Sequence, residues 1–194
     1  MHKLLATAGM FGLLALSGPA LGDAAQYLPS CNGCHGADGV SGPMPDAPII
    51  AGIPAVVQED ALFAYRDGGR ECWPPGLMCQ LSGPLSDDDI VELGAHFAEM
   101  PFKPAGEDFD AALAAEGEKI HKESCAICHG MDDPGDAESS ILHGQKITYL
   151  RNVMVQYAAG EREQLPAMQT AVSALTPEQT EAILNYYASY RVAP

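Results

Sequence analysis

Two stretches of the chain carry apolar residues at the three- and four-residue spacing of a helix face. Each stretch follows a residue that favours a helix start. Ser86 and Thr176 are good N-caps, Pro177 suits the first helical position, and Gln179 can complete a capping box with Thr176. The pattern therefore predicts two similar helices that start 90 residues apart, with apolar faces formed by Ile90, Leu93, Phe97 and by Ile183, Leu184, Tyr187.

The pattern in the rest of the chain is also helical. A short helix is predicted around each of two cysteine-rich segments, and a further helix follows Gly52 and Gly144, as in residues 148–154. Residues 101–106, Pro-Phe-Lys-Pro-Ala-Gly, break the first half and form a linker, after which the chain resumes at Phe109. We expect an all-α fold with two tandem domains, residues 23–102 and 103–194.

The N-terminal segment reads as a targeting sequence. Lys3 precedes an apolar run over residues 4–16, and small residues follow up to Gly22. This arrangement predicts a signal peptide over residues 1–22, cleaved near Gly22 and Asp23. An uncleaved membrane anchor is the alternative, but the run is shorter than the roughly 20 residues that span a bilayer. We expect a soluble periplasmic protein without a membrane span after cleavage, in a compartment where disulfides persist.

The two halves match each other residue by residue. The offset between matching residues drifts from 94 to 92 to 90, as small loop deletions would produce. Two long copies indicate a tandem duplication and not a solenoid. The aligned pairs are Cys31 with Cys125, Cys34 with Cys128, His35 with His129, Gly36 with Gly130, Gly52 with Gly144, Tyr65 with Tyr157, Gly68 with Gly160, residues 69–71 with 161–163, Ser86 with Thr176, and Phe97 with Tyr187.

Four of the six cysteines form two Cys-x-x-Cys-His motifs, which are typical of covalent haem attachment. Two thiols on one helical turn reach the two vinyl groups of a haem, and the following histidine supplies the proximal imidazole of the iron. A thioredoxin-like motif would need one copy in a βαβ setting, and a zinc site would leave each histidine unexplained. The motifs therefore predict two covalently bound haem c groups, attached at Cys31, Cys34, Cys125 and Cys128, with His35 and His129 as axial ligands.

Methionine is the expected sixth ligand of each iron. Met78 and Met168 lie eight residues before Ser86 and Thr176, and each follows a proline in a stretch expected to be irregular. Met44 and Met131 are too close to their own histidine, and Met100 and Met154 sit in helical patterns where methionine usually fills the core. Of the other histidines, His96 and His121 are expected on exposed helix faces. His143 is expected at the surface, with contact to a haem propionate as the alternative.

The last two cysteines, Cys72 and Cys79, flank the Met78 loop and lack a haem motif. In an oxidising compartment they are expected to form a disulfide that stiffens this loop. The second half has no counterpart, so the two domains are not equivalent. Trp73 lies in the same loop, where a place at the haem edge, in a docking surface or in the core are all open.

Charge limits the classes of partner. With the signal peptide removed, 26 Asp and Glu face nine Lys and Arg, a net charge of −17. Nucleic acid and anionic lipid are therefore poor partners, and a redox protein with a basic docking face is favoured, although acidity also serves solubility. Aromatic residues make up only 7% of the chain, so two small domains would have thin cores unless a haem filled each of them.

The chain resembles the diheme class I cytochromes of the cytochrome c4 type over nearly its whole mature length. The residues that carry the resemblance are the two motifs with their following glycines, residues 50–52 and 142–145, Tyr149-Leu150, and the two methionines ahead of Ser86 and Thr176. Within that group, residues 102–105, 109–113 and 117–121 are similar to the cytochrome subunit of flavocytochrome c sulfide dehydrogenase, from which Cys72, Cys79 and Trp73 depart.

This resemblance implies two tandem class I cytochrome c domains and a flavoprotein partner that oxidises sulfide and passes electrons to the haems. A free carrier between a respiratory complex and a terminal oxidase is the second hypothesis. A catalytic diheme enzyme, such as a peroxidase or a thiosulfate dehydrogenase, is the third. Catalysis at haem generally needs an open iron position, whereas each domain here offers a methionine, so we expect no catalytic residues in this chain.

Overall fold

The computed structural model describes residues 22–72, 76–130, 140–162 and 166–191. Residues 1–21 of the predicted signal peptide, Trp73 and Met131 lie outside the described residues. The described part of the chain is helical and contains no strand, which confirms the all-α prediction. None of its helices is both long enough and apolar enough to cross a membrane.

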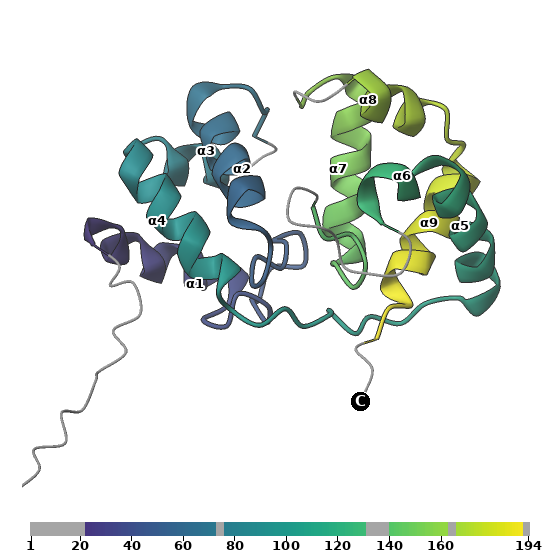
Figure 1. The fold of residues 1–194 in the computed structure, drawn as a ribbon, viewed down its shortest axis with the longest axis horizontal. Coiled ribbons are helices and arrows are strands. Elements are labelled where there is room, and N and C mark those ends of the chain that lie inside the picture. Colours follow the sequence, from purple (N-terminus) through teal and green to yellow (C-terminus); the bar gives the residue numbers. More distant parts are fainter. Residues whose placement is uncertain (1–21, 73–75, 131–139, 163–165, 192–194) are drawn as a thin grey trace, which may run out of the picture.

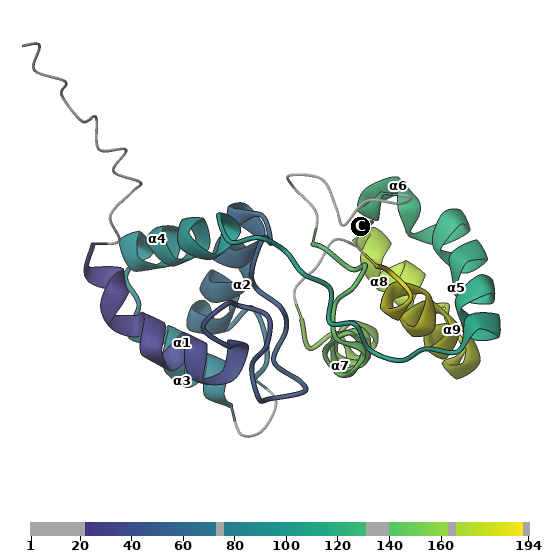
Figure 2. The same ribbon diagram turned by 90° about the horizontal axis from the view of Figure 1, so that it is seen from below.

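The helices fall into two groups that lie side by side (Figures 1 and 2). We call the first group the first domain and the second group the second domain. The segment between Ala98 and Ala111 joins them along one edge of the molecule. The first domain contains η1 (Asp23–Tyr27), α1 (Leu28–His35), α2 (Ala55–Asp67), α3 (Leu77–Ser82) and α4 (Asp87–Ala98). The second contains α5 (Ala111–Ser124), α6 (Ala126–His129), α7 (Ile147–Ala159), α8 (Pro166–Ser173) and α9 (Pro177–Ala188).

The last helix of each domain begins at a capping box. At α9, Thr176 Oγ1 accepts a hydrogen bond from the Gln179 backbone N–H, and Gln179 Oε1 accepts one from the Thr176 N–H, as the sequence predicts. At α4, Ser86 and Asp89 make the same two bonds. In this geometry side chains satisfy two backbone donors that the helix start leaves unpaired, so both starts are well defined.

Each domain has its own core beneath its last helix. In the first domain Ile90, Leu93 and Phe97 pack with Ala24 of η1 and Leu85. In the second domain Leu150 of α7 packs with residues of α9, namely Ile183, Leu184 and Tyr187. The apolar positions predicted for both helices are therefore confirmed as core residues.

Helices α5 and α9 cross at close range in the second domain. Gly117 of α5 lies against the backbone of Ala182 and Ile183, so a Cβ atom at this position would collide with main chain. A glycine is therefore required where these two helices cross.

The two domains contact each other through hydrogen bonds to main chain. Gln145 Oε1 accepts a hydrogen bond from the Ile49 N–H at 2.7 Å, and Gln145 Nε2 donates to the Ile49 carbonyl at 2.9 Å. Lys146 Nζ donates to the Met44 carbonyl at 3.1 Å. The Gln145 side chain is 2% exposed, so these are interior contacts that fix the second domain against the loop after α1.

Candidate haem-binding sites

A cavity of about 490 Å³ lies between α1, α2 and α3 of the first domain and reaches the second domain. Helix α1 carries Cys31, Cys34 and His35 into its wall, and α3 carries Met78. The structure thus brings together the four side chains predicted for the first haem. The volume of the cavity falls within the range of about 300–1,000 Å³ that is usual for ligand and cofactor sites. Most of the other lining is apolar and includes Ile49, Ile53, Leu62, Leu81, Leu93 and Phe97.

The ring of His35 is held in one orientation. Its Nδ1 lies 2.8 Å from the Pro48 carbonyl and donates to it, so Nε2 carries the lone pair. Burial lowers the pKa of His35, with nearby Lys146 acting in the same direction. A neutral imidazole with a fixed tautomer is the form that binds a metal. Gly36, with φ of +85°, then turns the chain where a Cβ would meet the Gly42 backbone.

Met78 lies in helix α3 and not in the irregular stretch expected from the prolines before it. Helix α3 begins after Gly76, whose φ of +75° only glycine adopts readily. The same difference applies to Met168, which lies in α8. Both methionines therefore lie in the short helix that comes directly before the capping box of their domain.

Polar side chains inside the first cavity show which kind of group fits it. Arg70 is 5% exposed, and its Nε has no hydrogen-bond partner among the described residues. Fully buried Ser82 also has an Oγ without a partner there. A buried guanidinium strongly favours an anion nearby. Nη2 of Arg70 donates to Gln156 Oε1 at 3.4 Å, so Nε is the donor left for a ligand. An apolar cavity lined by such an arginine fits a haem, which is flat and apolar and carries two carboxylates.

Arg70 belongs to a cluster that joins the two domains. Its backbone forms an isolated antiparallel β-bridge with that of Arg162, the residue that matches Arg70 in the repeat. Each guanidinium stacks on a tyrosine of its own domain, Arg70 on Tyr65 at 4.4 Å and Arg162 on Tyr157 at 4.7 Å. Burial opposes ionisation of the Tyr149 phenol between them, but the two guanidinium groups outweigh it and lower the pKa of Tyr149.

The second motif has a different setting. Helix α6 is only four residues long and follows α5 through Cys125, which serves as its N-cap. Gly130, with φ of +73°, repeats the turn made by Gly36. Ile127, between the two cysteines, is 95% exposed, and the matching residue of the first domain is Gly33. Met168 is half-buried in α8, and its pairing with His129 rests on the repeat and stays a prediction.

The expectation that His121 is an exposed helix residue is wrong, because it is fully buried. Its Nε2 donates to the Gly130 carbonyl at 2.7 Å, so its Nδ1 accepts from the Tyr187 hydroxyl at 3.0 Å. Burial raises the pKa of the Cys125 thiol, which is hydrogen-bonded to the same hydroxyl. These bonds join the core of the second domain to both ends of its haem motif.

The other two histidine expectations also change. His143 is 3% exposed and not a surface residue, because its ring stacks edge-on against Tyr186, Tyr187 and His121. His96 is half-buried with its ring against Phe97. Helical spacing alone places a histidine on a face, but it does not show which neighbouring helix covers that face. The expected core roles of Met100 and Met154 agree with their packing against the two cores.

The repeated motif, the cavity and the all-α fold define a class I diheme cytochrome c, and known proteins of this class match the chain from end to end. A cytochrome c4 from Pseudomonas aeruginosa is 30% identical over 197 residues, covering 95% of this chain and 94% of that protein. The chain belongs to the cytochrome c4 family and carries two covalently bound haem c groups. The solved cytochrome c4 of Acidithiobacillus ferrooxidans superposes with a TM-score of 0.74 at 26% identity, covering 84% of this chain and 99% of that one.

Other matches come from sulfur and oxygen metabolism. A thiosulfate dehydrogenase electron acceptor from Thiomonas intermedia is 30% identical over 209 residues, covering 100% of this chain and 94% of that protein. A solved thiosulfate dehydrogenase from Marichromatium purpuratum has a TM-score of 0.68 at 25% identity, covering 82% of this chain and 36% of that one. The family model of cbb3-type cytochrome c oxidase subunit III matches residues 112–186. The chain is thus an electron-transfer protein of the cytochrome c4 kind.

Proposed function

We propose that this chain is the diheme electron acceptor of a periplasmic dehydrogenase that oxidises a reduced sulfur compound, with thiosulfate as the first candidate substrate. The observation that carries the proposal is the end-to-end similarity to the thiosulfate dehydrogenase electron acceptor of Thiomonas intermedia. The similarity to part of the solved thiosulfate dehydrogenase chain supports it, because there a cytochrome c4-like portion belongs to a dehydrogenase polypeptide.

In this proposal Cys31 and Cys34 attach the first haem, and His35 and Met78 are its axial ligands. Cys125 and Cys128 attach the second haem, with His129 and Met168 as axial ligands. The haem iron supplies one-electron exchange between its ferric and ferrous states. The chain's own residues hold and tune it, since Pro48 orients His35, and Arg70 offsets negative charge at the cavity edge.

The first haem cavity lies at the interface between the two domains. The first cavity is lined by residues of both domains, including Tyr149 and Gln156 of α7. A constant separation between the two haems requires domains that are held rigidly against each other. The buried bonds of Gln145 and the Arg70–Arg162 cluster supply that rigidity.

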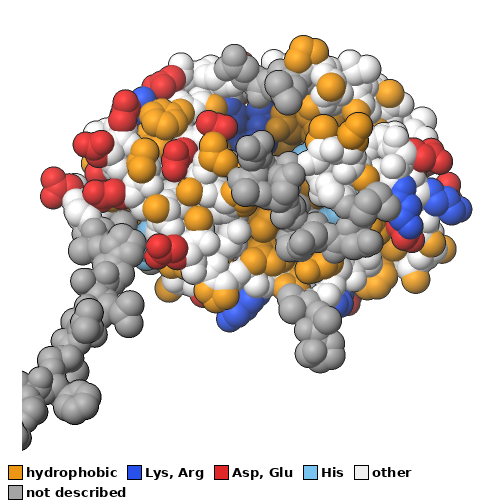
Figure 3. All heavy atoms as spheres, viewed as in Figure 1, with side chains coloured by type: hydrophobic (Ala, Val, Ile, Leu, Met, Phe, Trp, Pro, Cys, Tyr) orange, Lys and Arg blue, Asp and Glu red, His pale blue; other side chains and the backbone are white. Residues whose placement is uncertain are grey.

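Charge supports a partner with a basic docking face. Residues 23–102 carry twelve Asp and Glu and only two Lys and Arg. Of those two cations, Arg66 is paired with Asp67 and Asp87, and Arg70 is buried. Acidic side chains accordingly gather on the outer side of the first domain (Figure 3). Such a surface steers a cationic partner during encounter and repels nucleic acid and anionic lipid.

A flavoprotein sulfide dehydrogenase is the second candidate donor, favoured by the local similarity of residues 102–121 to the cytochrome subunit of that enzyme. Much of this stretch is part of the second domain, because residues 111–121 belong to α5. The Ala105 N–H donates to the Gly144 carbonyl at 2.7 Å, and Asp110 caps α5. Because this stretch also serves the fold, it supports the sulfide partner less directly than an end-to-end similarity supports thiosulfate. A free carrier between a respiratory complex and a terminal oxidase is the remaining alternative.

Isolation from native periplasm tests the proposal. We expect a complex in which thiosulfate reduces both haems, whereas sulfide without a flavoprotein does not. A flavin-containing complex with sulfide-dependent haem reduction would replace thiosulfate by sulfide. A monodisperse protein reduced only by quinol-linked donors would overturn both candidates in favour of the carrier. Sequencing the N-terminus of the same material tests cleavage near Gly22 and Asp23.

A further inference from the structure

The two domains differ in how the chain approaches the predicted methionine ligand. In the first domain Cys72 and Cys79 are joined by a disulfide, with Cα atoms 6.0 Å apart and seven residues of sequence separation. Met78 precedes Cys79 directly and is therefore inside the closed ring. The matching residues of the second domain are Gln164 and Gln169, which cannot form such a bond.

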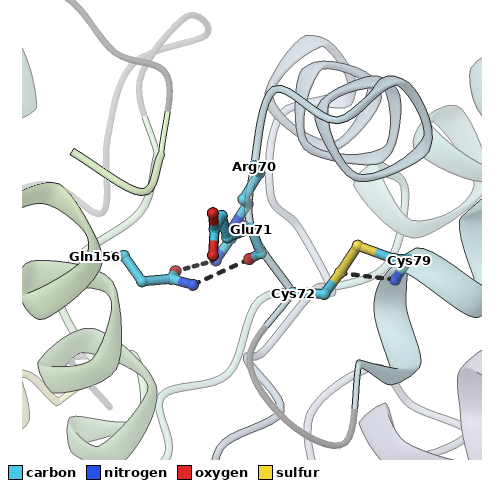
Figure 4. Close-up of a disulfide and its surroundings, with 5 residues drawn as sticks. All are labelled: Arg70, Glu71, Cys72, Cys79 and Gln156. Atoms are coloured by element: carbon cyan, nitrogen blue, oxygen red, sulfur yellow. Dashed lines mark hydrogen bonds between the residues drawn. A yellow bond between two sulfur atoms is a disulfide. The ribbon is translucent and has the colours of Figure 1, made fainter. Parts of the chain in front are cut away.

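The Cys72 end of the ring is held by the second domain (Figure 4). The Glu71 N–H donates to the Glu161 carbonyl at 2.9 Å, and Gln156 Nε2 donates to the Glu71 carbonyl at 3.1 Å. Arg70, one residue earlier, forms the bridge with Arg162. The residues just before Cys72 are thus fixed by α7 and by the segment that follows it.

The Cys79 end of the ring needs such support, because α3 has only six residues. A helix of that length does not form by itself in water. The disulfide ties its first turn to the fixed Cys72, and the Cys79 N–H lies 2.9 Å from Cys72 Sγ. Cys72, Met78 and His35 line the same cavity, so the ring closes beside the space that the iron must occupy.

We propose that the Cys72–Cys79 disulfide positions Met78 over the first haem, and that the second domain holds this device in place through residues 70 and 71. This proposal rests on the assignment of Met78 as an axial ligand. A thioether is an uncharged ligand that competes with water and other small ligands for the iron. Closing the chain around it removes conformations in which the sulfur points elsewhere.

The test uses the ferric holoprotein with both haems. Cys72→Ala with Cys79→Ala is compared with Met78→Ala, Met168→Ala and wild type by the near-infrared thioether-to-iron band. We expect the double cysteine variant to lose about half the band, as Met78→Ala does, because one of two haems changes its ligand. We also expect imidazole to bind its first haem at least about tenfold more tightly than in wild type. The reduction potential of the second haem should not change.

The outcomes separate the two proposals. If Met78→Ala keeps the full band, the ligand assignment is wrong and the positioning role falls with it. If Met78→Ala loses half the band and the double cysteine variant keeps all of it, only the positioning role is overturned. Gln169→Ala, at the position in the second domain that matches Cys79, is the matched control and should leave the band intact.

A chemical version of the test avoids refolding a variant. Wild-type holoprotein is reduced with a phosphine, alkylated with iodoacetamide and reoxidised with ferricyanide. Peptide mapping then establishes that Cys72 and Cys79 both carry the label. Loss of about half the band in labelled protein supports the positioning role. A full band in labelled protein overturns it, whatever the double cysteine variant shows.

Discussion

The two domains start their last helices with the same geometry and different chemistry. Asp89 completes the capping box of α4, and Gln179 completes that of α9. Each side chain offers an oxygen to the N-cap N–H, but only the carboxylate titrates. Its hydrogen bonds with Ser86 lower the pKa of Asp89. A duplicated fold can therefore keep its capping hydrogen bonds while the box of one copy titrates and the box of the other does not.

The two domains differ more in the side chains packed beneath those helices. The first domain places Tyr27 and Phe97 where the second places His121 and Tyr187. In the first domain this region is an apolar packing of rings and aliphatic side chains. In the second it is a buried polar network that contacts the haem motif at Cys125 and Gly130. The second domain thus supports its haem motif from the core, whereas the first supports its methionine by a disulfide.

The two domains also differ in the charge of their surfaces. On α5 of the second domain, Lys119 pairs with Glu116 and Lys122 with Glu118, so basic side chains offset acidic ones along the helix. Residues 23–102 have two Lys and Arg side chains, buried Arg70 and half-buried Arg66, and Arg66 is already paired. The first domain is accordingly the stronger electrostatic target for a basic partner. The two copies therefore differ in surface charge although their haem motifs are the same.

Removing one haem should have the largest effect, and the effect should be confined to the domain that loses it. Cys31→Ser with Cys34→Ser is expected to yield protein with one haem, because no thioether can form in the first domain. Helix α1 and the short α3 surround the emptied cavity, so we expect faster hydrogen exchange there, with α5 and α9 unchanged. The mass of the denatured holoprotein counts the haems. The matched variant Cys125→Ser with Cys128→Ser should leave the first domain protected, and two retained haems in either variant would contradict the assignment.

Separating the domains should have the next largest effect. Gln145→Ala leaves the buried N–H and carbonyl of Ile49 without their partner, at about 1–3 kcal/mol for each group. We expect denaturant unfolding, followed at each haem, to split from one transition into two. Gln169→Ala on exposed α8 is the control and should unfold as wild type does. Coincident transitions at wild-type denaturant concentration in Gln145→Ala would show that the interface does not couple the domains.

Removing the Tyr187 hydroxyl tests the polar core of the second domain. Tyr187→Phe leaves His121 Nδ1 buried without a donor, so we expect a loss of about 1–3 kcal/mol in the free energy of unfolding. Introducing the first domain's pair, His121→Tyr with Tyr187→Phe, removes that unpaired acceptor and should recover part of the loss. Urea titration of the three proteins measures both effects. If the double variant loses more free energy of unfolding than Tyr187→Phe, the unpaired His121 Nδ1 is not the cause of the destabilisation.

The capping boxes should give the smallest effect and the cleanest contrast. Because its folded pKa is lowered, the Asp89 carboxylate stabilises α4 above the ordinary Asp pKa of about 3.9, and this contribution is lost as pH falls through the lowered value. We expect α4 of wild type to lose more hydrogen-exchange protection in acid than α4 of Asp89→Asn at the same pH. Helix α9 has its own carboxylates with lowered pKa, Glu178 and Glu181, and Gln179→Glu should add to its acid sensitivity. Equal acid sensitivity of α4 in Asp89→Asn and wild type would assign the effect to other carboxylates.

Local sequence was enough to predict the features that depend on neighbouring residues. The spacing of Cys31, Cys34 and His35 on one helical turn predicts haem attachment because the cofactor's own geometry requires it. The N-caps of α4 and α9 and their buried faces also followed from residues within one or two helical turns. The repeat itself was visible without any structure, because its offsets drift only by small loop deletions.

Tertiary structure decided the features that depend on residues far apart in the chain. Helical spacing could not show that His121 is buried, since its partner Tyr187 lies 66 residues away on the helix that covers it. Alignment matched Arg70 with Arg162 as equivalent residues, but only the packing of two copies brings them face to face. The same holds for Gln145, whose partner Ile49 is 96 residues distant. Chemistry within a turn is specified by sequence order, whereas burial and pairing across domains require the folded coordinates.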